Sequence, residues 1–182
     1  MDLVDLIAEK RFLGQEFLTW LWWKSEERGG SVELPDSGDI LVEFEKHMLL
    51  EYGEEEYEER LICSGLQSEL KEARTGLQTG KKIEQARVRL VKGDHEYHVT
   101  LGATLMDFRS VRLPKTAEGS ASNESGREES EGLILERIFL CEEVMKVIDD
   151  LFRLFVTVRT SDQWGHELNT IRQWVAGISN EG

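Results

Sequence analysis

The sequence has few of the residues and runs that mark several protein classes. It holds two cysteines and two prolines among 182 residues. No run of about 18 uncharged apolar residues occurs, so we expect no membrane-spanning helix. We expect a cytoplasmic protein of bacterial type. The first residues are acidic where a secretory signal is basic, so we expect no export signal. Cys63 and Cys141 lie among apolar residues and are expected to be buried thiols, with a disulfide as the alternative.

Catalytic and metal-binding motifs are also scarce. The chain contains no CxxC, HExxH, P-loop or GxSxG pattern. His95 and His98 are spaced as HxxH, but on a strand positions three apart face opposite sides, so we expect two surface histidines and no zinc site. With 36 acidic residues, carboxylates come close by chance and no glycosidase-like pair stands out. We therefore expect a non-enzymatic protein without cofactor or metal.

The charge of the chain is strongly negative and uneven. The formal net charge is −14, which repels nucleic acid at long range. The segment 81–115 is the exception, because it carries an excess of Lys and Arg. Basic side chains that alternate along a strand can meet phosphates, although charge alone favours an ordinary solvated face on which they pair with nearby acids. The candidates for contact with nucleic acid are Lys81, Lys82, Arg87, Arg89, Arg109 and Arg112.

Apolar periodicity predicts an α+β fold with an antiparallel sheet, a meander, flanked by N-terminal and C-terminal helices. Gly29 and Gly30 are expected to end the first helix. The predicted helices cover residues 2–28, 68–77, 133–159 and 162–178, and the predicted strands lie within 31–34, 39–65 and 81–113. The organisation that follows is an N-terminal helix plus antiparallel sheet domain over 1–115, a flexible polar loop over 116–132, and a C-terminal helical hairpin over 133–182 that packs on the same core.

Two helical segments carry more apolar surface than one sheet can cover. Trp20, Trp22 and Trp23 cannot all face one core, because adjacent helical positions diverge by about 100°. They predict a second contact surface, within the protein or on a partner, and are the candidate partner interface. The apolar residues of the helix over 133–159 also cover more than the stripe of about 100° that packing on one sheet requires. We expect its surplus to be covered by the C-terminal helix, by the tryptophan helix or by a second subunit, and we favour a homodimer.

Two segments carry a resemblance to a known family. The run GKKIEQARVRLVKGDHEYHVTLGATLMDFRSVRLP from Gly80, and FLGQEFLTWLWWKSE upstream, resemble the C-terminal half of the recombination-associated protein RdgC family. The shared pattern is a helix ending in Gly-Lys, two strands joined by a turn, and a basic strand ending in Arg-x-Leu. The resemblance implies non-specific binding of duplex DNA by ring-shaped dimers whose basic inner surface encloses it, and a role in limiting recombinase access to DNA.

A second hypothesis assigns the chain the same fold without a DNA-binding surface. In it the chain is a protein–protein adaptor or scaffold. The two hypotheses differ in the placement of the basic residues of segment 81–115. Convergence on one concave face favours DNA, and dispersal among acids favours the adaptor.

Overall fold

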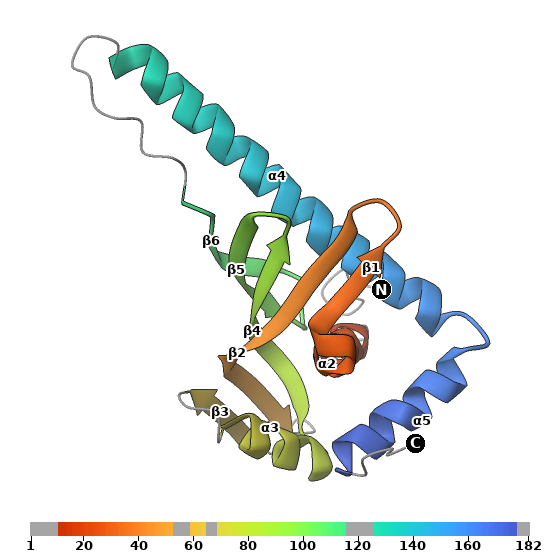
Figure 1. Ribbon diagram of the computed structural model, residues 1–182. Coiled ribbons are helices and arrows are strands. Elements are labelled where there is room, and N and C mark those ends of the chain that lie inside the picture. The colour runs from red at the N-terminus through yellow and green to blue at the C-terminus, as the bar shows by residue number, and fades with distance from the viewer. Residues whose placement is uncertain (1–10, 53–58, 65–68, 116–125, 178–182) are drawn as a thin grey trace, which may run out of the picture.

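The computed structural model describes residues 11–52, 59–64, 69–115 and 126–177 of the chain. The protein is α+β, with a six-stranded antiparallel sheet and helices at both ends of the chain, as the sequence predicts (Figure 1). The elements are α2 (Arg11–Glu26), η1 (Glu27–Gly30), β1 (Ser31–Leu34), β2 (Gly38–Tyr52), β3 (Glu59–Ser64), α3 (Glu69–Gln78), β4 (Lys82–Lys92), β5 (His95–Gly102), β6 (Phe108–Arg112), α4 (Gly126–Arg159) and α5 (Trp164–Val175).

The sheet is built around the long strand β2. Its strand order is β1-β2-β4-β5-β6, and β2 pairs with β1 through its first residues and with β3 through its last. The pairing of β2 with β4 slips between Phe44 and Met48. Strict alternation places Lys46 on the same face as Met48, but the structure buries Met48 and exposes Lys46. From Phe44 to Met48, β2 advances by four residues while β4 advances by two, from Val88 to Ala86. Lys46 lies in this bulge and turns outward, and Met48 resumes the inward alternation.

Helix α2 lies between the sheet and the two C-terminal helices. Trp22 packs against Phe44 of β2 and Trp174 of α5, with ring centroids 6.1 and 5.0 Å away. Trp20 packs against Phe155 of α4 at 5.6 Å. The second contact surface expected for these indoles is therefore inside the protein. The assignment of a partner interface to Trp20, Trp22 and Trp23 is corrected, since all three are buried within this chain.

The glycines of α2 have separate roles. The helix runs unbroken through Gly14, where an added Cβ would collide with the backbone of Ala103. Gly14 thus lets the helix approach the segment after β5 closely. Helix α2 ends at Glu26, and in the following η1 the residues Arg28, Gly29 and Gly30 take positive φ, so the chain leaves the helix close to the predicted Gly29-Gly30.

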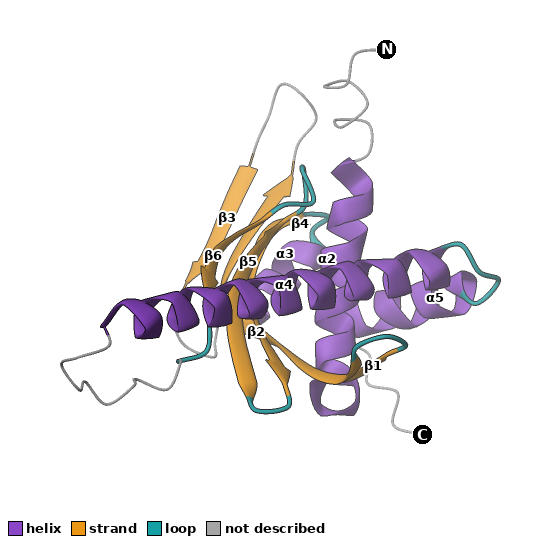
Figure 2. Ribbon diagram, turned by 90° about the horizontal axis from the view of Figure 1, so that it is seen from above, coloured by secondary structure: helices purple, strands orange, loops and turns teal. Residues whose placement is uncertain are grey.

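Helix α4 is longer than the sequence analysis predicted. It begins at Gly126, so 126–132 is helical where a polar loop was expected, and 116–125 lies outside the described residues. The polar, glutamate-containing sequence of this stretch is compatible with a helix as well as with a loop. The later part of α4 buries Val144, Leu151 and Phe155 in the core that α2 and the sheet share. The earlier part projects beyond the sheet (Figures 1 and 2).

No described helix combines the length and the apolar character that a membrane crossing requires.

Candidate interaction surfaces

The basic residues of β4 point away from the core, as predicted. Ala86, Val88 and Leu90 are buried on one face, while Arg87 and Arg89 stand between them on the other. Acids of the neighbouring strands occupy the same outer face, so each arginine has a carboxylate beside it. The outer face of the sheet is therefore a mixed ionic surface.

The ion pairs on this face join three strands. Arg89 donates to Glu43 of β2 and, at 2.8 Å, to Glu96 of β5. Arg87 Nε lies 2.8 Å from Glu45 Oε2, in an ion pair without hydrogen-bond alignment. A phosphate group would have to displace these carboxylates to reach the guanidinium groups.

The pair of Arg89 and Glu96 stands out in its electrostatics. The hydrogen bond from Arg89 lowers the pKa of Glu96 to about 2. The hydrogen bonds to Glu96 and Glu43 in turn raise the pKa of Arg89 above its usual value. His98 also contacts this group, with Nε2 3.0 Å from Glu96 Oε1 and Nδ1 against Glu45. Arg89 and Glu96 therefore stabilise each other's charged forms.

The other four candidates lie elsewhere. Lys81 and Lys82 line a cavity of about 480 Å³ among residues of α2, α3 and α5. Arg109 lies 3.0 Å from Asp107, and Arg112 is exposed on the edge strand β6. The predicted nucleic-acid residues are therefore dispersed among acids, which is the arrangement that favours the adaptor hypothesis.

The two histidines of the HxxH pattern diverge, as predicted. His98 joins the outer-face ion pairs, whereas His95 Nδ1 lies 2.6 Å from Glu143 of α4. Tyr97 donates to the same carboxylate, and Lys92 Nζ lies 3.2 Å from it. Within the described ranges, no group of three or more His, Cys, Asp or Glu side chains is placed to hold a metal ion. The cluster around Glu143 instead fastens α4 to the sheet.

The electrostatics agree with a fastening role. Burial opposes ionisation of Glu143, but hydrogen bonds from Tyr97, His95 and Lys92 outweigh it and lower the pKa of this carboxyl. Burial and the Glu143 carboxylate raise the pKa of Tyr97. About two helical turns after Glu143, Asp150 is buried and accepts hydrogen bonds from Ser37 of the β1–β2 turn and from Lys146. Two carboxylates thus tie α4 to the sheet.

The first part of α4 presents an exposed apolar surface. We call residues 132–145 the α4 arm. Every side chain from 132 to 139 is exposed, although this stretch is mostly apolar. A helix that is apolar on all sides is normally covered. The large exposed apolar residues of the arm are Leu133, Ile134, Leu135, Ile138, Phe139 and Met145.

The sequence analysis noted the apolar surplus of this helix but did not locate it. The signal that it missed is a spacing of four, three and four residues, from Ile134 through Ile138 and Cys141 to Met145. Cys141 is exposed on this stripe, contrary to the expectation of a buried thiol, while Cys63 is buried. Both cysteines are free, as expected.

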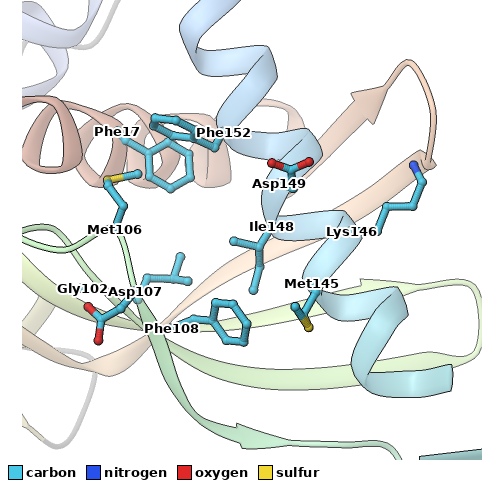
Figure 3. A pocket seen from close by; sticks show the side chains of 11 residues that line it. Phe17, Gly102, Met106, Asp107, Phe108, Met145, Lys146, Ile148, Asp149 and Phe152 are labelled. Carbon is cyan, nitrogen blue, oxygen red and sulfur yellow. The ribbon is translucent and has the colours of Figure 1, made fainter. Parts of the chain in front are cut away.

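The stripe continues into a groove beside β6. A cavity of about 480 Å³ opens between α4 and the β5–β6 region. Ile148 and Met145 of α4 face Phe108 of β6, and Phe152 lies beside Phe17 and Met106 at the other end of the cavity, as Figure 3 shows. The exposed arm and this groove meet at Met145, and together they are the candidate site for a partner.

Comparisons of the chain with protein-family models, with curated proteins and with solved structures found no match, so the resemblance to the RdgC family stays a prediction.

Proposed function

We propose that this chain is a non-catalytic protein–protein adaptor that binds a partner through the α4 arm. The observation that carries the proposal is the run of exposed Leu, Ile and Phe side chains on a helix that projects from the sheet. Covering a large apolar side chain contributes about 1.5–3 kcal/mol. Several such side chains on one arm therefore favour association strongly enough to offset the entropy of ordering the interface.

Non-specific binding of duplex DNA, as in the RdgC family, is the second candidate. It is supported by the strand register, which places Arg87, Arg89 and Arg112 toward one face of the sheet. The carboxylates of Glu43, Glu45 and Glu96 on that face oppose it. The net charge of −14 opposes it further. The acidic neighbours and the net charge together outweigh the strand register, so the adaptor hypothesis is favoured over DNA binding.

The proposed setting is the reducing cytoplasm of a bacterial cell. It is supported by the free thiols of Cys63 and Cys141. An exposed free thiol such as Cys141 persists where thiols are kept reduced.

The experiment compares the wild type with two double variants. The arm variant is Ile134→Glu with Ile138→Glu, and the sheet variant is Arg87→Glu with Arg89→Glu. Association with a protein, self-association included, is measured by sedimentation velocity and by quantified co-purification, and duplex DNA is titrated at about 50 mM salt. We expect the arm variant to lose its association, the sheet variant to keep it, and DNA not to bind. Salt-dependent DNA binding that only the sheet variant loses would replace the adaptor with the DNA hypothesis.

A further inference from the structure

The spacing of the exposed stripe points to a particular occupant of the α4 arm. Ile134, Ile138, Cys141 and Met145 recur at steps of four, three and four residues. Ile134 and Cys141 are seven residues apart, as are Ile138 and Met145, and seven residues is the heptad repeat of a coiled coil, in which the seam of one helix packs on an equal seam. We infer, resting on the proposed adaptor function, that the α4 arms of two copies of this chain pair as a parallel, in-register coiled coil.

The seam fits heptad positions lettered a to g. Ile138 and Met145 take the a positions, and Ile134 and Cys141 take the d positions. A β-branched residue at a, such as Ile138, is typical of parallel two-stranded coiled coils. Ile134, Ile138 and Met145 are each about half exposed, at 54%, 49% and 51%. These side chains are therefore available to a second copy.

The charges beside the seam are complementary in the parallel arrangement. Arg137 falls at position g and Glu142 at position e of the next heptad, five residues later. In a parallel pair, g of one helix lies beside that e of the other, so two Arg137–Glu142 ion pairs form across the seam. In an antiparallel pair, g faces g and e faces e, which separates these opposite charges. The charge pattern thus favours the parallel orientation.

The arm has room for a second helix. The side of α4 that packs on its own fold carries Leu140, Val144 and Val147, all of them outside the seam. A second copy can therefore cover the seam without displacing the core. The seam reaches the groove beside β6 at Met145, so the coiled coil spans only 134–145. Such a short seam predicts a weak dimer, with a dissociation constant on the order of micromolar.

Two neighbouring substitutions test the seam in the full chain. Ile138→Glu places two carboxylates in the seam and should raise the dissociation constant at least about 100-fold. Phe139→Glu is the matched control, since Phe139 is next in sequence and 57% exposed but lies at position b, outside the seam. It should leave the dissociation constant unchanged. Sedimentation equilibrium measures both constants, and circular dichroism checks that both variants fold.

Two further measurements test the orientation. Arg137→Glu should weaken the dimer about tenfold, because two attractive pairs become repulsive. Combining it with Glu142→Arg should restore wild-type affinity. In register, the two Cys141 thiols face each other, so an added mild oxidant should take two electrons and two protons from them. The resulting disulfide-linked dimer should be absent from a Cys141→Ser variant.

Some results would overturn the inference. A wild type with the mass of one 20.9 kDa chain at high micromolar concentration would do so. Equal losses in Ile138→Glu and Phe139→Glu, or no rescue by the charge exchange, would do so as well. If the chain is a monomer but the arm variant still loses a different protein partner, the inference fails and the adaptor function survives. If neither association depends on the arm, both fail.

Discussion

Two apolar helical stretches of this molecule have opposite surroundings. The segment 17–23 of α2 and the segment 133–139 of α4 are both rich in large apolar residues. The first buries Trp20, Trp22 and Trp23, and the second leaves every side chain exposed. The difference lies in what surrounds each helix, because α2 has the sheet on one side and α4 and α5 on the other. Apolar sequence predicts that a surface will be covered, but not whether this chain covers it.

The comparison assigns different roles to the two stretches. The tryptophans of α2 hold the sheet and the C-terminal helices together, so their removal should unfold the protein. The exposed apolar side chains of the α4 arm contribute little to the folded monomer, so substitutions of these side chains should affect association and not stability. The predictions below test that contrast, from the largest expected effect to the smallest.

The largest effect is expected at Trp22, which packs between Phe44 and Trp174. Trp22→Ala should lower the free energy of unfolding by about 3–5 kcal/mol, because it leaves a large cavity. Ile134→Ala, on the arm, should change it by less than about 0.5 kcal/mol when the protein is dilute and monomeric. Urea unfolding followed by fluorescence measures both. Similar losses in the two variants would contradict the division between core and arm.

A smaller effect is expected at Glu143, where the packed part of α4 meets the sheet. Glu143→Gln should lower the free energy of unfolding at pH 7 by about 1–2 kcal/mol, because charge-assisted hydrogen bonds with His95 and Lys92 are lost. The folded state lowers the pKa of Glu143 below its usual 4.5. The stabilisation is therefore fully present above that pH and is lost as the pH falls through the lowered value.

The difference between wild type and Glu143→Gln should consequently shrink as the pH falls below about 4.5. Denaturant titrations of both proteins from pH 7 to pH 3 measure it. A difference that stays constant over this range would show that Glu143 does not fasten α4 through its charge.

The smallest effect is expected on the outer face of the sheet. Arg89→Ala should lower the free energy of unfolding by roughly 0.2–1 kcal/mol, since exposed ion pairs contribute little and are screened by salt. Gln85, on the same strand, provides the control Gln85→Ala. Duplex DNA should not bind the wild type at about 50 mM salt. Binding with a log–log salt slope near −4 to −5, the value for about five phosphate contacts, would instead support an RdgC-like function.

Much of the fold could be predicted from the sequence. Alternating apolar residues predicted β4 and β5, and Gly29-Gly30 predicted the approximate end of α2. The slip in β2 near Phe44 could not be predicted, because alternation assumes regular pairing. The start of α4 at Gly126 was missed because a polar, glutamate-containing stretch has the composition of either a loop or a solvated helix. Local sequence does not separate these cases.

The candidate sites were harder to predict than the fold. The outward direction of Arg87 and Arg89 followed from alternation, but their pairing with Glu45, Glu43 and Glu96 depends on which strands become neighbours. The burial of the tryptophans depends on α4 and α5, which come more than 100 residues later in the chain. The stripe from Ile134 to Met145 was present in the sequence as a spacing, but its exposure could be seen only once the other face of α4 was placed.

Amide hydrogen exchange tests the contrast between the two stretches most directly. It is measured on the wild type at several protein concentrations, and the backbone amides of 133–139 are compared with those of 17–23. The account predicts that the amides of 133–139 exchange rapidly in dilute protein, because an uncovered helix end is of low local stability, and become protected as the concentration rises. The amides of α2 should be protected throughout. Amides of 133–139 that are as protected as those of α2 at the greatest dilution would contradict the claim that the arm requires a partner.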